Sequence, residues 1–190
     1  TDWQLDPIHG GRFAAWAPSS ALPDAPGLDV KMAWAVGRGD QWVALAQGAV
    51  LDRKRGDAYA RALAASLGDF SVENPVGHGV HWASAMEAAL RAWNLVLSLW
   101  ILSARAAPPE PDLAVDAARL IVATGRFVLA HLEDDTAVTN NHLTANWLGL
   151  LACAEGLPEW PEAPRWRALA LAGLSRASEE QVHRDGTSFE

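Results

Sequence analysis

The chain contains very few of the residues on which several classes of protein depend. Its 190 residues include one cysteine, Cys153, one tyrosine, Tyr59, and only two lysines. A single cysteine cannot form a disulfide within the chain, which excludes a small disulfide-stabilised fold and leaves the redox compartment unassigned. The sequence also has no GxSxG, P-loop or GxGxxG motif, so it does not indicate an α/β-hydrolase, a nucleotide hydrolase or a dinucleotide-binding protein.

Long hydrophobic runs are also missing. The most apolar segment, 92–107, is interrupted by Asn94, Ser98 and Arg105, and it is shorter than the roughly 20 apolar residues that a membrane-spanning helix needs. The sequence therefore predicts no membrane span. The chain starts with TDWQ, without Met or an apolar leader, so we expect it to begin inside a longer product or after a removed signal.

The chain also has fewer basic than acidic residues. The formal net charge is −8, which argues against a nucleic-acid partner or an anionic membrane surface, because such binding sites are normally basic. Half of the residues are hydrophobic and a fifth are charged, the balance of a helix-rich globular protein. The length is enough for one domain with a sizeable core.

The distribution of breakers and apolar residues predicts an all-α fold. Residues 1–27 are rich in Pro, Gly and Ser and are expected to form an extended lead-in segment. No stretch alternates apolar and polar residues with a period of two, so residues 28–190 are expected to form antiparallel helical hairpins. The expected helices are 29–49, 57–70, 82–106, 112–133, 139–156 and 165–183.

The helix expected at 82–106 has two different faces. Its apolar face consists of Met86, Leu90, Trp93, Leu97 and Ile101, and its narrow polar stripe of Ser84, Glu87, Arg91, Asn94 and Ser98. The spacing of Glu87 and Arg91 allows them to pair. Either the stripe lies on a solvated surface, or the helix is buried and presents the stripe to an internal cleft. We expect the second arrangement, with this helix among the inner ones. The ten tryptophans fit a carbohydrate-binding cleft and an ordinary core equally well.

Two histidine-containing stretches have spacings that could suit a metal. His78 and His81 lie three residues apart in a glycine-containing loop, but no third ligand lies nearby in the sequence. The segment 131–135, HLEDD, is more typical of a solvated helix end, although acidic residues there oppose the helix dipole. We therefore assign no metal site.

The segment TNNHLTANWLGLLACAEG, at 139–156, has an unusually polar helix entrance. Thr139 or Asn140 can serve as the N-cap, because either side chain can accept a hydrogen bond from a first-turn N–H. This leaves Asn141 and His142 without a local structural task. Either they are solvated polar residues beside a cap, or they are functional groups presented at a helix N-terminus.

Several segments resemble the heparinase II/III-like polysaccharide lyases, whose relatives include alginate and oligoalginate lyases. In order, these segments are WQLDPIHGGRF (3–13), DVKMAWAVGR (29–38), NPVGHGVHWASAMEAALRAWN (74–94), TNNHLTANWLGLL (139–151) and QVHRDGTSFE (181–190). The resemblance implies that residues 28–190 form part of an incomplete (α/α) toroid. It also implies a following antiparallel β-sandwich, before which this chain stops.

The chain departs from the family pattern at two positions. Ala35 stands where the family usually has an acidic residue, and His81 stands where it usually has Asn. The resemblance places the catalytic tyrosine beyond Glu190, so Tyr59 is not expected to take that role. We therefore expect the isolated chain to have little or no lyase activity.

The resemblance implies cleavage of an acidic, uronate-containing polysaccharide or oligosaccharide by β-elimination. Asn141 and His142 are then the expected catalytic residues. The expected substrate-binding residues lie in or beside the matching segments: Asn140, Trp82, Glu87, Arg91 and Gln181. No cofactor is expected in this chain, although the resemblance allows a metal in the β-sandwich domain that it implies. The resemblance also favours a periplasmic or secreted location. The alternative is a noncatalytic helical module that binds a glycan or a protein.

Overall fold

The computed structural model describes residues 1–21, 25–107, 110–134 and 140–188, and within them the protein is all-α, as expected. Pairing between extended segments is limited there to isolated bridges, such as the one between Pro18 and His78. The helices are η1 (Ser19–Ala21), α1 (Val30–Gly37), α2 (Asp40–Leu51), α3 (Gly56–Glu73), η2 (Val80–Trp82), α4 (Ala85–Leu102), α5 (Pro111–Ala130), α6 (Asn141–Gly156) and α7 (Ala163–Gln181).

The helix expected at 29–49 is in fact two helices. Asp29 caps α1 by accepting a hydrogen bond from the Lys31 N–H, but the chain then turns at Gly39, whose φ is +81°. Residues with a Cβ rarely adopt this conformation. A Cβ at Gly39 would also lie 2.5 Å from the Trp42 ring. The expectation of one continuous helix was wrong, because the spacing of apolar residues does not reveal a single residue with a left-handed backbone conformation.

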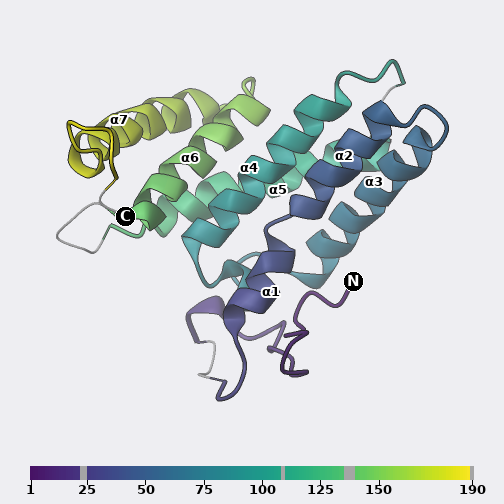
Figure 1. Ribbon diagram of the computed structural model, residues 1–190, viewed down its shortest axis with the longest axis horizontal. Coiled ribbons are helices and arrows are strands. Elements are labelled where there is room, and N and C mark those ends of the chain that lie inside the picture. Colours follow the sequence, from purple (N-terminus) through teal and green to yellow (C-terminus); the bar gives the residue numbers. More distant parts are fainter. Residues whose placement is uncertain (22–24, 108–109, 135–139, 189–190) are drawn as a thin grey trace.

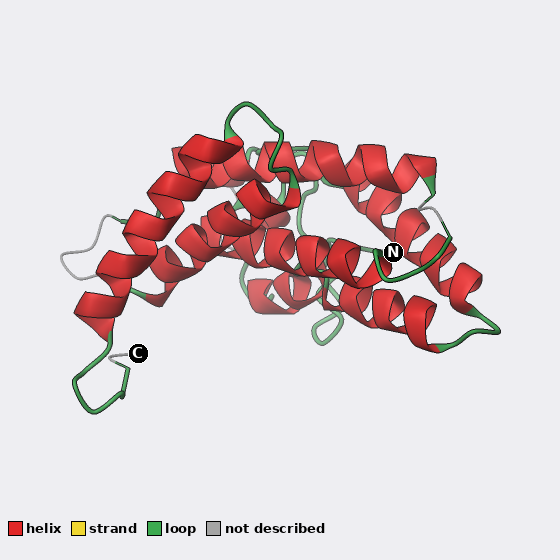
Figure 2. Ribbon diagram, turned by 90° about the horizontal axis from the view of Figure 1, so that it is seen from above, coloured by secondary structure: helices red, strands yellow, loops and turns green. Residues whose placement is uncertain are grey.

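The helices are arranged in two layers (Figure 1). Helices α2, α4 and α6 lie side by side, with α3 and α5 behind them, and α7 packs against α6. The pairs α2–α3, α4–α5 and α6–α7 form the three expected hairpins. Seen from above, the helices form an arch (Figure 2). Helix α1 contacts α4 and η2.

Helix α4 occupies the centre, packed against α2, α5 and α6, but the orientation of its faces is the reverse of the expected one. The polar stripe is buried, with Glu87, Arg91 and Ser98 at 1%, 0% and 0% exposure. On the face expected to form the core, Trp93 is 37% exposed. The stripe contacts the junction of α1 and α2, not an internal cleft.

Helix α4 is the one helix among the described residues that is long and apolar enough to cross a membrane. More than half of its 18 residues are buried inside the bundle. Length and composition are therefore weak evidence for a span, because the core helix of a globular protein has the same properties.

Two charged residues of the polar stripe, Glu87 and Arg91, bond groups of the α1–α2 junction. The Arg38 guanidinium donates to both carboxylate oxygens of Glu87, at 2.8 and 2.7 Å. The Arg91 guanidinium donates to the carbonyl oxygens of Gly37 and His81, at 3.3 and 2.9 Å. Glu87 thus forms its hydrogen bonds with Arg38, in place of the expected pairing with Arg91.

Aromatic rings enclose Arg91 on the remaining sides. Its guanidinium carbon lies 4.8 Å from the centre of the Phe70 ring and 4.9 Å from that of the Trp82 ring. Burial lowers the pKa of Arg91 to about 9, against the opposing effect of the Glu87 carboxylate. The group still carries its charge near neutral pH, and cation–π contacts contribute more to its stabilisation in this desolvated site than they would at the surface.

The lead-in segment is anchored into the helical domain. Trp3 is buried, its indole N–H donates to Asp69, and its carbonyl oxygen lies 2.6 Å from Nε2 of His81. Asp6 accepts hydrogen bonds from the backbone N–H groups of Asp29, Ile8 and His9. Burial raises the pKa of the Asp6 carboxyl, but these hydrogen bonds outweigh it and hold the pKa well below its usual range.

Close packing of α4 against α6 depends on Gly149. A Cβ at this position would lie 2.4 Å from both Cα and Cβ of Ala89, and backbone cannot be displaced as easily as a flexible side chain. We expect Gly149→Ala to lower the free energy of unfolding by about 1–3 kcal/mol, the usual cost of overpacking a core. Thermal and denaturant unfolding measure the effect.

Gly68→Ala is the matched control, because a Cβ at Gly68 would meet only the Asp116 side chain at 3.4 Å. Alanine has the higher helix propensity, by up to about 1 kcal/mol, so this change should be neutral or stabilising. Equal effects of the two substitutions would contradict the assigned contact between α4 and α6.

The buried His81 predicts a loss of stability in mild acid. Burial, followed by the charge of Arg91, lowers its pKa to about 4, although the hydrogen bond with Trp3 opposes the shift. An unfolded histidine titrates near pH 6.5, so between about pH 6.5 and 4 the unfolded state binds a proton that the folded state does not. The contribution of His81 to the free energy of unfolding is therefore fully present above pH 6.5, and it decreases as the pH is lowered toward 4.

The total loss from this group should be roughly 3 kcal/mol, at 1.36 kcal/mol per pKa unit. Denaturant unfolding of the wild type and of His81→Asn between pH 7.5 and 4 measures it. We expect the free energy of unfolding to decrease less with falling pH in the variant than in the wild type. The difference between the two proteins at pH 7.5 measures the packing that the substitution removes. Parallel curves would show that another group causes the acid sensitivity.

Candidate functional site

The entrance of α6 has the N-cap that the sequence predicts. Asn140 has an extended backbone, and its side-chain oxygen accepts a hydrogen bond from the Leu143 N–H at 2.8 Å. The carbonyl oxygen of Asn140 accepts a hydrogen bond from the Thr144 hydroxyl. Of the two candidate caps, Asn140 fills the position, and Thr139 lies outside the described residues. The expected contact between Asn140 and substrate stays a prediction.

Asn141 and His142 form the start of the first turn, and both are exposed. Capping is performed by the residue before them. The backbone N–H groups at this end of α6 give it a partial positive charge. The arrangement therefore presents an amide and an imidazole to solvent at a helix end that attracts anions.

The carboxylate of Glu133 lies beside this entrance, and the sequence did not predict a role for it there. Glu133 was expected to belong to a solvated helix end, but α5 ends at Ala130 and Glu133 contacts two other helices. Its oxygens accept hydrogen bonds from the Ser84 hydroxyl at 3.1 Å, the Met86 N–H at 3.0 Å and the Asn146 amide at 3.2 Å. Nδ1 of His142 lies 3.6 Å from one of these oxygens.

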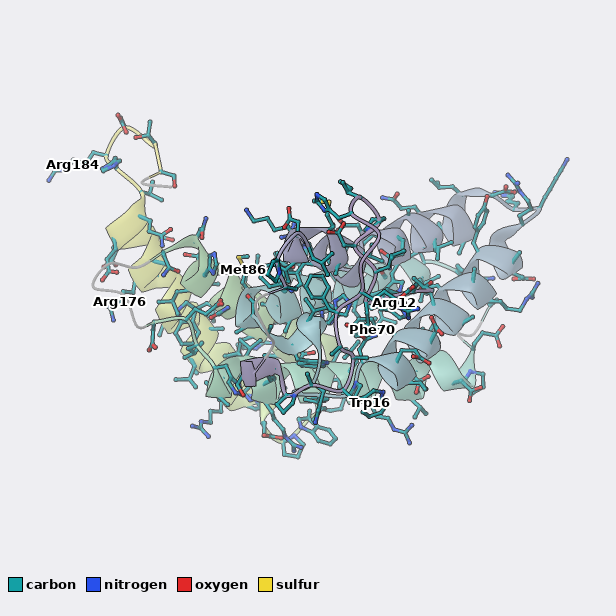
Figure 3. All side chains as sticks on the ribbon, turned by 90° about the horizontal axis from the view of Figure 1, so that it is seen from below. Arg12, Trp16, Phe70, Met86, Arg176 and Arg184 are labelled. Atoms are coloured by element: carbon teal, nitrogen blue, oxygen red, sulfur yellow. The ribbon has the colours of Figure 1, made fainter. Side chains whose placement is uncertain are left out.

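Asn146 completes the connection between Glu133 and α6. It is fully buried, and its side-chain oxygen accepts a hydrogen bond from the Glu133 N–H at 2.9 Å. The sequence did carry a signal, because Asn146 follows His142 by four residues and so lies on the same face of the helix. Figure 3 looks onto this end of the molecule and labels Met86, whose backbone meets Glu133.

The other residues predicted to bind substrate are buried. Trp82 is 1% exposed, and its indole N–H donates to the Asn74 carbonyl oxygen. Glu87 and Arg91 lie against the α1–α2 junction, and Gln181 is buried at the end of α7. The structure therefore does not bring these four side chains to the surface beside Asn141 and His142, and their role in substrate binding stays a prediction.

Within the described part of the chain, no three His, Cys, Asp or Glu side chains are grouped so that they could hold a metal ion. His78 is half-buried, with Nδ1 at 3.1 Å from the Val76 carbonyl oxygen, whereas the His81 ring is buried. Of the segment 131–135, Asp135 lies outside the described residues. A metal in a further domain remains an expectation from the resemblance.

The family profile described as heparinase II/III N-terminus matches residues 1–190. A solved structure described as a heparinase III gene product with methylated lysines has a similar fold, with a TM-score of 0.65 and 20% sequence identity. The match covers 85% of this chain but only 27% of that chain. No curated protein matches the sequence. The all-helical architecture and the match over the whole sequence lead to one assignment: the chain belongs to the heparinase II/III N-terminus family.

Proposed function

We propose that this chain is the helical domain of a polysaccharide lyase that cleaves a uronate-containing glycan by β-elimination, with Asn141 and His142 at the reacting sugar. The observation that carries the proposal is the entrance of α6. Asn140 performs the capping, and the two residues that follow are exposed at the positive end of the helix. The family assignment supports a polysaccharide as the substrate class.

β-Elimination at a uronate presents a specific electrostatic problem. The proton alpha to the carboxyl group is removed, the electron pair forms the new double bond, and the 4-linked oxygen departs and takes a proton from solvent. Negative charge accumulates on the carboxyl oxygens as the proton leaves. Hydrogen-bond donors aimed at those oxygens therefore stabilise the transition state more than the ground state.

The residues at the α6 entrance have suitable chemistry for this problem. The side-chain amide of Asn141 can donate a hydrogen bond to the carboxylate without carrying a charge of its own. His142 can accept the proton, because imidazole has an unperturbed pKa near 6.5 and exchanges protons readily near neutral pH. The chain spans only 27% of the length of the heparinase III structure that it matches.

Asn141→Ala in the intact protein tests the carboxylate contact. If the amide stabilises the developing charge, kcat should fall on the order of 10²–10³-fold with a smaller change in KM. The unsaturated product absorbs ultraviolet light, so turnover can be followed directly. The melting temperature should stay close to that of the wild type, because a polar contact at a helix entrance usually contributes only about 1 kcal/mol.

Gln47→Ala is the control, since it removes an exposed amide from α2. Normal turnover in a destabilised Asn141→Ala variant would exclude the catalytic interpretation. It would favour the alternative that the domain binds a glycan or a protein without reacting with it.

His142→Ala tests proton transfer separately. Loss of a general base typically costs at least about 10²-fold in rate, so kcat should fall by that amount while glycan binding, measured by calorimetry, is retained. His183→Ala is a suitable control, because it removes an exposed imidazole beyond the end of α7. A variant with wild-type kcat would remove His142 from the mechanism.

A further inference from the structure

We propose that Glu133 is a positioning residue that fixes the tautomer and orientation of His142, so that Nε2 of the imidazole is the atom presented to substrate. The proposal rests on the proposed function for its catalytic consequence only. Its structural content concerns one carboxylate, one imidazole and the helices that hold them. The sequence pattern did not assign Glu133 a role in this site.

Glu133 is held at both of its carboxylate oxygens. One accepts the Ser84 hydroxyl, and the other accepts the Met86 N–H and the Asn146 amide. These donors come from two helices, α4 and α6, and the backbone N–H of Glu133 is also bonded to Asn146. Glu133 therefore has little freedom to turn away from His142.

His142 is the more exposed partner of this pair. Its side chain is 47% exposed, compared with 27% for Glu133, and Nδ1 lies 3.6 Å from the nearer carboxylate oxygen. This separation is longer than a hydrogen bond but within the range of an ion pair. A small rotation of the imidazole brings Nδ1–H onto a carboxylate oxygen that already has a fixed position.

The choice of tautomer follows from this geometry. In a neutral imidazole one nitrogen carries the proton and the other has a lone pair, and the hydrogen bond made by one nitrogen decides the state of the other. A carboxylate only accepts hydrogen bonds, so it favours the proton on Nδ1. The lone pair is then on Nε2, which can accept a proton, and the role of donor to the uronate falls to Asn141.

Glu133 can do this without repelling an anionic glycan strongly. Its carboxylate accepts the first-turn N–H of Met86, at the N-terminus of α4, where the helix dipole offsets negative charge. Two further donors, the Ser84 hydroxyl and the Asn146 amide, bond the same carboxylate. The carboxylate is thus directed toward α4 and α6, and its side chain is less exposed than that of His142.

The tautomer can be measured on this chain without any activity assay. Nitrogen-15 NMR of histidine-labelled protein distinguishes a protonated ring nitrogen from a bare one, and His142→Ala identifies the resonances of His142 among the six histidines. The measurement is made at about pH 8.5, where unperturbed imidazoles are neutral. We expect Nδ1–H to predominate in the wild type.

Glu133→Gln removes the carboxylate while keeping the size of the side chain. We expect the Nδ1–H population of His142 to fall by at least about twofold, because the amide no longer provides a charge that selects that tautomer. Glu155→Gln is the matched control: it makes the same substitution on α6 and removes the ion pair with Arg167, and it should leave the His142 spectrum unchanged.

Predominant Nε2–H in the wild type would overturn the proposal, whether or not the variant folds. So would equal tautomer populations in the wild type and a folded Glu133→Gln. In the intact enzyme, Glu133→Gln should lower kcat about tenfold or more with little change in KM, as loss of an orienting group does. A shifted tautomer combined with normal turnover would support the positioning and refute the proposed function.

Discussion

The burial of Arg91 is the constraint on which the arrangement of the other helices depends. A guanidinium transferred from water into a core costs several kcal/mol unless its donors are paired. Arg91 is fully buried, and its two terminal nitrogens donate to the carbonyl oxygens of Gly37 and His81, while its Nε has no hydrogen-bond partner among the described residues. Gly37 is the last residue of α1, where carbonyl groups have no partner within the helix. The break between α1 and α2 therefore supplies an acceptor that an uninterrupted helix would not have.

The α1–α2 junction also provides hydrogen bonds to the second buried charge of α4, the Glu87 carboxylate. Glu87 is paired with Arg38, the residue that follows α1, and the Asn94 amide bonds both the Arg38 carbonyl oxygen and Asp40. Removing one member of such a network leaves its partner buried and unpaired, which is usually more costly than the pair is favourable. The rotation of α4 about its axis is fixed in this way, and with it the position of its first turn.

The first turn of α4 in turn positions the candidate site. Ser84 and Met86 hold Glu133, which contacts Asn146 and His142 on α6. The contacts thus run continuously from the buried arginine to the exposed imidazole.

The sequence predicted those features that depend on local pattern. The all-α class, three hairpins and the cap at Asn140 follow from periodicity and from side-chain chemistry within a few residues. The orientation of α4 did not follow, because an apolar stripe normally indicates the buried face. Here Glu87 and Arg91 of the polar stripe bond Arg38 and the carbonyl group of Gly37, and both partners are about 50 residues away in the sequence. The role of Glu133 was missed for a related reason, since its partners Ser84 and Met86 come from an earlier helix.

The net charge of −8 poses a question for a domain proposed to act on an acidic glycan. Net charge governs long-range attraction, whereas binding and catalysis depend on the groups within a few ångströms of the substrate. At the α6 entrance the nearby carboxylate, Glu133, is engaged by hydrogen bonds from α4 and α6. The side chains of Asn141 and His142 are exposed there, at the positive end of a helix. An uncharged donor such as the Asn141 amide has a further advantage in β-elimination, because it stabilises the developing anion without binding the ground-state carboxylate too tightly.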